Sequence, residues 1–379
     1  STTLSVMTAP VSQSEPKHQA ISRVLRLEIA AGKFIDQGKL PSEAKLVLRF
    51  GASRPTIARA LRTLEEDQLV ERRAGSGTYV KELATRDTNN PINEVGLLMP
   101  DLEDKEIFQL IWGEIATVAR THHFSVMWGA PAKARPSPEE MEAHGHKVCQ
   151  EFIERRVSGV FFAPSHRLHE INQQYAETLR KAGIPVVLLD KDLEAFPAHS
   201  EFDVASIDNI AGGHLLTEHL WKLGCRKFLF VTQSKPAATI CARIFGVRES
   251  LIQHGHPMDP GLARFGNVAD PVFVKQLLTD KPDVLLCSND ETAANLLQTL
   301  AKLRVNVPQD VRVTGFDDVK LAQLVTPPLT TVQQPSREIA QIAFGAMLER
   351  QNNALLPPRH LMIAPKLVIR ESCGTYPSA

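Results

Sequence analysis

The sequence contains few cysteines, and none of them is placed for a metal site or a disulfide framework. There are five, an odd number, with wide spacing and no C-x-x-C pair: Cys149, Cys225, Cys241, Cys287 and Cys373. Zinc sites use closely spaced pairs, and small secreted domains usually pair all their cysteines. The pattern therefore predicts reduced, mostly buried thiols in a cytoplasmic protein.

Long apolar runs and a secretory leader are also missing. No stretch approaches the roughly 18 consecutive apolar residues that a membrane-spanning helix needs. The first residues, STTLSVMTAPVSQSEP, have neither the basic start nor the apolar centre of a signal peptide. We therefore expect no membrane partner and a cytoplasmic location. Residues 1–16 are predicted to be a disordered tail, since they are rich in Ser, Thr and Pro.

Net charge is absent as well, because 43 Lys and Arg balance 43 Asp and Glu. This balance excludes a histone-like polycation or an acidic tail protein, but it hides an uneven distribution. Residues 17–83 hold thirteen basic and eight acidic residues, a surplus of five positive charges, whereas residues 84–379 carry four net negative charges. A basic segment of about 65 residues is sized and charged for contact with a nucleic-acid backbone.

Residues 17–83 show the pattern of three short helices followed by a hairpin. Apolar residues recur at helical spacing in three stretches, and Ser42 and Ser53 are placed to cap the second and third helices. Residues 69–73 and 78–80 are predicted to be two strands joined by a glycine-containing turn. This order of elements is the layout of a winged helix-turn-helix domain.

The third helix and the hairpin carry side chains that are suited to reading DNA. Arginine can fork onto a guanine edge or a phosphate, and threonine can contact a phosphate or a thymine methyl group. Glycines in the turn permit a close approach of the backbone. The candidates are Arg54, Thr56, Arg59 and Arg62 on the helix, and Arg72, Arg73, Gly75 and Gly77 on the hairpin. The alternative is the solvated basic face of an ordinary small domain.

The string LPSEAKLVLRFGASRPTIARALRTLEEDQLVERRAGSGTYV resembles the winged-helix domain of the GntR family of bacterial regulators. The P-S-E, S-R-x-T and G-x-G-T-[FY]-V elements occur in the family's order and spacing. The resemblance adds Ser42, Glu43, Ser53 and Thr78 to the candidate DNA-binding residues. One position departs from the family, which commonly has Arg two residues after the Thr where this chain has Ala58. The family's base contact at that point is therefore not carried over.

The rest of the chain alternates between apolar strands and amphipathic helices. Residues 84–91, ATRDTNNP, are polar and aperiodic and are predicted to be a linker. Wholly apolar strands that alternate with helices are typical of parallel sheets covered on both faces. About 280 residues of this pattern are too many for one ordinary sheet, so we expect two lobes. The expected strands are 94–99, 125–128, 159–163, 185–189, 228–231, 284–287 and 311–315; the expected helices are 107–121, 141–155, 168–182, 210–223, 243–254, 292–303 and 338–350.

Four segments of this region resemble the sugar-binding core of LacI-family repressors and type I periplasmic binding proteins: VGLLMPDLEDKEIF, SIDNIAGGHLLTEHLWKLGCRKFLFV, SNDETAA and VTGFDDVKLAQLVTPPLTTVQQP. The resemblance spans about residues 92–372 and implies an α/β domain of two Rossmann-like lobes with a ligand between them. It places lobe 1 at about 92–206 plus 331–346, and lobe 2 at about 207–330 plus 347–372. A GntR-like head on a LacI-like body is the arrangement of arabinose-repressor-like regulators.

A sugar site needs paired hydrogen-bonding groups for the hydroxyls and an aromatic face for the C–H surface. Arg243, Asp290 and Gln334 are the hydroxyl-binding residues that the motif implies. Further acceptors are expected at Asp101 and at Asp190 or Asp192. The aromatic face would come from Phe108 or, with less support, Phe265.

Several of these residues have structural alternatives. Asp290 is also placed to cap a helix, Arg243 could lie at the surface, and Phe108 could belong to the core. Residues predicted to hold loops or helix ends rather than ligand are Asp208, Asp317 and Asp318. A histidine cluster lacks the i, i+4 spacing of a zinc helix, so no metal site and no cofactor are expected; its members are His122, His123, His144 and His146.

Three functions are compared. The first is a ligand-responsive transcription regulator, a repressor that binds a two-half-site double-stranded DNA operator as a homodimer and responds to a sugar or sugar derivative. The second is the sugar-binding component of a transporter, which the basic head and the missing leader disfavour. The third is an enzyme on the same fold, but no G-x-G-x-x-G, P-loop, G-x-S-x-G or Cys/His pair supports it. We therefore expect a regulator and not an enzyme.

Overall fold

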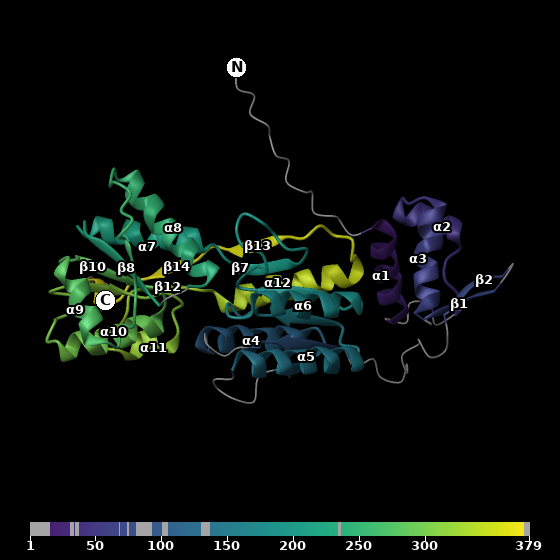
Figure 1. Cartoon of the computed structure of the whole chain (residues 1–379), viewed down its shortest axis with the longest axis horizontal. Coiled ribbons are helices and arrows are strands. Elements are labelled where there is room, and N and C mark those ends of the chain that lie inside the picture. Colours follow the sequence, from purple (N-terminus) through teal and green to yellow (C-terminus); the bar gives the residue numbers. More distant parts are fainter. Residues whose placement is uncertain are drawn as a thin grey trace, which may run out of the picture.

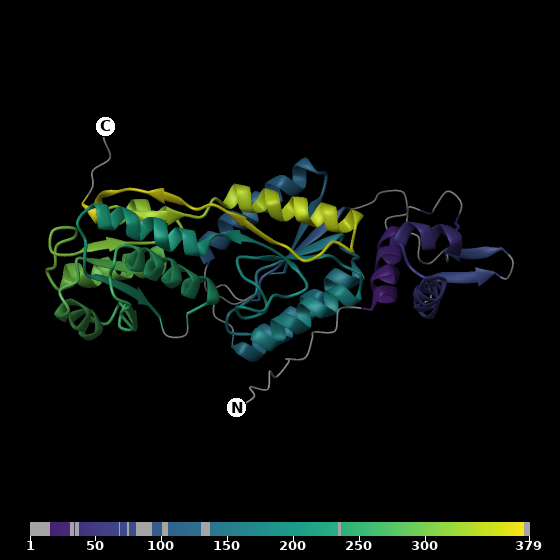
Figure 2. The ribbon, with the colours of Figure 1, turned by 90° about the horizontal axis from the view of Figure 1, so that it is seen from above.

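The chain folds into three parts that follow one another along the molecule (Figure 1). The computed structural model describes residues 16–30, 34, 38–67, 69–73, 76–80, 93–100, 105–129, 137–233 and 236–374. A small head and lobe 2 lie at opposite ends of lobe 1 in both views (Figures 1 and 2). The predicted linker and all but the last residue of the predicted tail lie outside the described residues. No helix in the described part is long and apolar enough to cross a membrane.

The head contains the predicted three helices and hairpin. They are α1 (Lys17–Ala30), α2 (Glu43–Phe50), α3 (Arg54–Glu66), β1 (Val70–Arg73) and β2 (Gly77–Val80). Ser42 and Ser53 accept hydrogen bonds from the first turns of α2 and α3, which confirms both predicted caps. Gly51 ends α2 with φ 54°, a left-handed conformation that glycine adopts without strain. The core of the head is built from one face of each helix: Ile21, Leu25, Ile29, Leu46, Ile57, Leu61 and Leu64.

Lobe 1 is a six-stranded parallel sheet with helices on both faces. The strand order is β13-β7-β6-β5-β3-β4. The strands are β3 (Glu94–Leu98), β4 (Ser125–Gly129), β5 (Gly159–Phe162), β6 (Val186–Leu189), β7 (Asp203–Ile207) and β13 (His360–Ile363). Helices α4 (Lys105–Thr121) and α12 (Ser336–Asn352) pack on one face, while α5 (Pro138–Glu154) and α6 (His169–Lys181) pack on the other.

Lobe 2 is a four-stranded parallel sheet of order β11-β10-β8-β9. Its strands are β8 (Phe228–Thr232), β9 (Ala263–Phe265), β10 (Val284–Cys287) and β11 (Arg312–Thr314). Its helices are α7 (Asn209–Lys222), α8 (Ala238–Gln253), α9 (Pro271–Thr279), α10 (Asp290–Lys302) and α11 (Lys320–Leu324). A short antiparallel pair, β12 (Thr331–Gln333) and β14 (Lys366–Val368), and a 3₁₀ turn (Glu371–Cys373) complete the described chain. The two parallel sheets confirm the predicted fold class.

The division of the last segments between the lobes differs from the expected one. Residues 347–363 lie with lobe 1, because α12 continues to Asn352 against that sheet and β13 pairs in parallel with β7. Conversely, β12 lies beside lobe 2, since Thr330 and Gln333 form bridges to the end of β11 and to Asp317. The reason is that β13 is short, lies at a sheet edge and alternates between exposed and half-buried residues, so its apolar signal is weak.

Candidate functional site

Helix α3 presents three arginines to solvent. Arg54, Arg59 and Arg62 are exposed, and none of them forms an ion pair with another residue of the described ranges. The opposite side of α3 is anchored in the head core by Ile57, Leu61 and Leu64. This arrangement leaves three guanidinium groups available to phosphates and base edges.

The other candidate DNA-binding residues are partly engaged within the head. Arg72 forms an ion pair with Glu43, and the Arg73 guanidinium bonds to Glu71 (Nε to Oε1, 2.7 Å) and lies 4.6 Å from the centre of the Tyr79 ring. These contacts are exposed and cost little to exchange for a phosphate.

Four further candidates have other surroundings, and a fifth lies outside the described residues. The hydroxyl groups of Ser53 and Thr56 are 2.8 Å apart and bond to each other. Thr78 points into the head core and is buried, so its side chain is not presented to a partner. Gly77 has φ 122°, and Gly75 lies outside the described residues.

A small cavity of about 30 Å³ lies between the two lobes. Lobe 1 lines it with α4 and with the residue after β6; lobe 2 lines it with α8 and with the loops after β10 and β11. In open α/β sheets, ligands bind outside the carboxyl ends of the strands, where these loops lie. Four candidates from the sequence meet here: Phe108, Asp190, Arg243 and Gln334.

Arg243 is held rigidly at the wall of this cavity. Its Nε donates to Asn209 Oδ1 (2.9 Å), its Nη1 donates to the Ser288 carbonyl (2.5 Å), and its guanidinium lies 3.7 Å from the centre of the Phe316 ring. The remaining Nη2 is 3.5 Å from Asp317 Oδ1. Because only 5% of the residue is exposed, the guanidinium is fixed before any ligand arrives. The alternative of a surface position for Arg243 is therefore wrong.

The Asp317 carboxylate contacts both Arg243 and Gln334 at the cavity. Gln334, at the segment that leads back to lobe 1, donates from Nε2 to Asp317 Oδ1 (2.7 Å). Asp317 has φ 110°, and Asp190 on the facing lobe has φ 72°. Such backbone angles are uncommon outside glycine and concentrate at functional sites. An arginine donor beside two carboxylates matches neighbouring hydroxyl groups of one ligand.

Phe108 belongs to the core and also lines the cavity. It is almost fully buried in the lobe 1 core, where its ring stacks on Trp112 with centroids 6.2 Å apart, and it also lines the cavity. Ile107 and Ile111 lie beside it on α4. The lobe 1 wall is therefore mainly apolar, and the lobe 2 wall is mainly polar.

Asp290 lies beneath the cavity and does not line it. It is fully buried; its Oδ1 accepts from the Thr331 hydroxyl (2.6 Å) and its Oδ2 from the Val319 amide (3.0 Å). The helix cap is the preceding Asn289, which accepts from the Thr292 amide (2.8 Å). Asp290 thus fixes the loop that carries Asp317. Burial, reinforced by the charge of Asp317, raises the pKa of Asp290 to about 8.

Two other effector candidates, Asp192 and Phe265, do not line the cavity. The Asp192 carboxylate accepts hydrogen bonds from His360 Nε2 (2.8 Å) and from the Ser200 amide (3.2 Å). Burial acts to raise the pKa of Asp192, but these hydrogen bonds outweigh it and hold the pKa below its usual value. Phe265 ends β9 with about half of its surface exposed and does not line the cavity. Asp101 lies outside the described residues.

Sequence reasoning missed three polar cavity residues: Thr239, Asn289 and Asp317. Asp317 had been assigned to holding its loop. The usable signal was its position directly after a lobe 2 strand, at the sheet edge that binds ligands. The structural roles predicted for Asp318 and Asp208, holding a loop and capping a helix, are confirmed. Asp318 accepts from Gln333 (2.8 Å) and Arg370 (2.6 Å), and Asp208 caps α7.

A larger cavity of about 310 Å³ lies elsewhere on lobe 2. It is at the amino ends of the strands, where residues such as Lys227 and Pro282 precede β8 and β10. Two of its cations have partners, since Arg264 pairs with Asp280 (3.0 Å) and Arg226 lies on the Trp221 ring. Its position at the amino ends of the strands favours the smaller interlobe cavity as the ligand site.

The raised pKa of Asp290 predicts a pH-dependent effect of Asp290→Asn. A carboxyl with a pKa of about 8 when folded and about 4 when unfolded stabilises the fold at low pH, and this stabilisation is lost as the pH rises toward 8. Asparagine keeps a similar shape without ionising. The Tm of the variant minus that of the wild type should become more positive from pH 5 to pH 8, measured by circular dichroism. A difference that stays constant or falls over this range would show that Asp290 is ionised in the fold.

Two known protein families match this chain, one in the head and one in the body. Residues 17–80 match the family described as bacterial regulatory proteins, gntR family, and residues 217–373 match the periplasmic binding protein-like domain. The HTH-type transcriptional repressor PurR of Vibrio atlanticus is 28% identical over 230 residues, which cover 59% of this chain and 66% of that protein. This chain thus spans just under two thirds of that relative.

Two other proteins align over most of the chain. The arabinose metabolism transcriptional repressor of Halalkalibacterium halodurans is 24% identical over 94% of this chain and 96% of its own length. The transcriptional regulator CelR in complex with cellobiose has a TM-score of 0.63 and 21% identity, over 85% of this chain and 91% of its own. The chain therefore combines a head that matches the gntR family of bacterial regulatory proteins with a body that matches, over residues 217–373, the periplasmic binding protein-like domain.

Proposed function

We propose that this protein is a sugar-responsive transcription repressor of the bacterial cytoplasm, which binds a two-half-site operator as a homodimer. The head, residues 17–83, reads the DNA through α3. The body, residues 92–372, binds a sugar or sugar derivative between its lobes, and a pentose or hexose suits the polar group of Asp190, Arg243 and Asp317. The DNA-binding set is centred on Arg54, Arg59 and Arg62.

The observation that carries this proposal is the pairing of two unlike surfaces in one chain. An exposed row of arginines on α3 fits a polyanion, whereas the interlobe cavity is lined by one arginine, two carboxylates and two amides. A transporter component has no use for the first surface. An enzyme would need a nucleophile or an acid–base pair at the cavity, and the relatives reported above carry the names of regulators.

Ligand entry requires the lobes to separate. The cavity of about 30 Å³ has room for little more than water, while sites for small ligands occupy about 300–1,000 Å³. Phe108 and Asp190 belong to lobe 1, and Arg243 and Asp317 belong to lobe 2, so the lobes must move apart to admit a sugar and close on it. Differential binding to the open and closed states is what couples a ligand to a second site.

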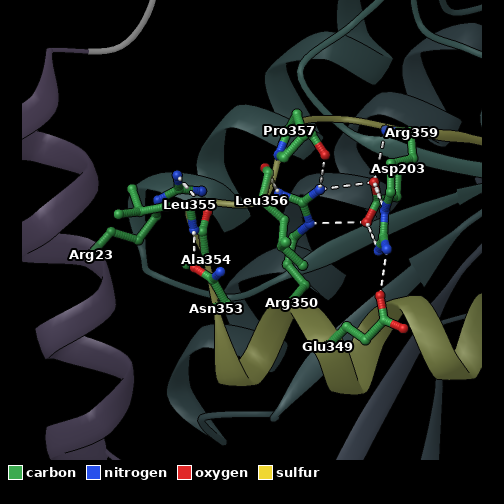
Figure 3. A network of polar contacts seen from close by, with 10 residues as sticks. All are labelled: Arg23, Asp203, Glu349, Arg350, Asn353, Ala354, Leu355, Leu356, Pro357 and Arg359. Carbon is green, nitrogen blue, oxygen red and sulfur yellow. Dashed lines mark hydrogen bonds and ion pairs between the residues drawn. The ribbon is translucent and has the colours of Figure 1, made fainter. Parts of the chain in front are cut away.

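The head contacts the body through lobe 1. In Figure 3, Arg23 of α1 donates to the Ala354 carbonyl (3.3 Å), just beyond the end of α12. Arg350 of α12 holds the following turn by donating to the carbonyls of Leu356 (2.8 Å) and Pro357 (3.0 Å). A change in lobe 1 thus has a direct route to α1, and in a homodimer it would alter the spacing of two heads over two half-sites.

Arg54→Ala tests the proposed DNA surface. We expect it to weaken binding to a duplex selected from a random library by about 1–3 kcal/mol, or roughly 5- to 150-fold in Kd, because one guanidinium contact is lost. The measurement is fluorescence anisotropy, which should also show affinity falling steeply with salt. Arg226→Ala, at the far lobe, is the matched control. An unchanged Kd for Arg54→Ala, or an equal loss for both variants, would contradict the assignment.

A further inference from the structure

Three side chains with metal-binding chemistry meet on the surface of lobe 1, and none of them lines the interlobe cavity. They are Asp192, His199 and His360, and their nearest ligand atoms all lie within 4.8 Å of one another. Asp192 Oδ2 is 2.8 Å from His360 Nε2 and 3.7 Å from His199 Nδ1. The two imidazole rings meet edge to face with centroids 4.6 Å apart. Both histidines reach solvent, so an ion has access to the cluster.

The carboxylate of Asp192 is fixed in position by the backbone. Its Oδ1 accepts from the amides of Glu194 and Ser200, both at 3.2 Å, and the Ser200 amide also reaches Oδ2 at 3.3 Å. Oδ2 is in addition the oxygen that faces the two imidazoles. Hydrogen bonds of this kind orient metal-binding carboxylates and raise their affinity. The side chain is only 9% exposed, so its direction is set by the fold.

His360 is fixed as well. It is the first residue of β13, which pairs with β7, and the preceding Arg359 donates from its amide and its guanidinium to Asp203. Only His199 lies on a more exposed loop, where a small movement can adjust its ring.

The spacing of the three ligand atoms suits a metal ion with tetrahedral coordination. With bonds of about 2.0–2.1 Å, tetrahedral zinc ligands are about 3.3 Å apart, so shifts on the order of an ångström would bring these atoms to coordination distance. Imidazole and carboxylate ligands together favour zinc and related divalent transition metals over magnesium or calcium. Three protein ligands leave one position for water.

We infer that Asp192, His199 and His360 form a binding site for a divalent transition metal, zinc being the expected ion. The sequence gives no sign of it, because the ligands are separated by 7 and 161 residues and come together only when β13 joins lobe 1. The site ties the loop that starts near the cavity residue Asp190 to the strand that follows the head-contacting turn. It is independent of which sugar the cavity accepts.

Zinc titration of the untagged full chain tests the site. After dialysis against EDTA, calorimetry with zinc chloride at pH 7.5 should show one saturable site per chain, and bound zinc should raise Tm. His199→Ala, His360→Ala and Asp192→Asn should each weaken zinc binding by more than the roughly 10–100-fold that loss of an outer-shell partner costs. Cobalt should give the visible spectrum of a tetrahedral site in the wild type and lose it in His199→Ala.

His214→Ala is the matched control, because His214 lies on lobe 2, where its ring bonds to Gln253 (3.2 Å). It should bind zinc as the wild type does. His199→Ala should keep the wild-type Tm without metal, since the side chain is exposed, so a binding loss in that variant cannot come from unfolding. Absence of a saturable site, or equal zinc affinity in wild type and His199→Ala, would overturn the inference and leave these residues as an Asp–His ion pair.

Discussion

Asp203→Ala is expected to lower the free energy of unfolding by about 3–5 kcal/mol, the usual cost of leaving a buried charge without its partner. Asp203 is fully buried in β7 and accepts from Arg350 Nε (2.9 Å), Arg350 Nη2 (2.8 Å) and Arg359 Nη2 (3.0 Å) (Figure 3). Without the carboxylate, the nearly buried Arg350 has only backbone carbonyls as acceptors. Urea unfolding followed by circular dichroism measures the loss.

Glu349→Gln is the matched control for this prediction. Glu349 also pairs with Arg359, but more than half of its side chain is exposed, so its removal should cost less than about 1 kcal/mol. Equal losses for the two variants would mean that burial of Asp203 contributes nothing. Asp203→Ala should also loosen the turn after α12, seen as faster hydrogen exchange at residues 353–360, while the head core stays protected.

Gly246→Ala is expected to destabilise lobe 2 by about 1–3 kcal/mol or more, because α7 and α8 pack with their backbones in direct contact. A methyl group at this position would overlap the Ile210 carbonyl of α7 and come within 2.8 Å of the His214 amide nitrogen. The obstruction is backbone, so the two helices must separate. Since Arg243 lies one turn earlier on α8, sugar binding should weaken together with stability.

Gly345→Ala serves as the control, because it places a methyl group on another helix with no atom within 4 Å. It should be neutral or stabilise the protein by up to about 1 kcal/mol, as glycine is a poor helix former. Thermal unfolding of both variants checks the pair. A Tm for Gly246→Ala as high as that of Gly345→Ala would contradict the close packing of α7 and α8.

Local sequence signals were enough to predict the head and most of the body. The caps at Ser42 and Ser53 and the apolar strands that became β3, β5, β6, β8 and β10 carry their own information. Short strands at sheet edges do not. β9 has three residues and β13 alternates between exposed and half-buried ones, so their pairing is decided by distant partners.

For the same reason, only part of the candidate site could be predicted from the sequence. Arg243 and Gln334 were found because the motif of LacI-like proteins places Arg243 on the helix after a lobe 2 strand and Gln334 on the segment between the lobes, and both line the interlobe cavity. Asp290 and Asp192 were misplaced because their partners, Thr331 and His360, lie 41 and 168 residues away. Asp317 was missed because its role depends on a positive φ angle, which the residue type does not predict.

Operator affinity with and without sugar is the most direct test of the proposed regulator. The Kd for the selected duplex should be measured by anisotropy against a panel of pentoses, hexoses, disaccharides and sugar acids. At least one sugar should shift the wild-type Kd by about 5- to 150-fold and also raise Tm, and Arg243→Ala should keep the sugar-free Kd but lose the shift. DNA affinity that no sugar changes, or turnover of a sugar by the purified protein, would contradict a sugar-responsive repressor.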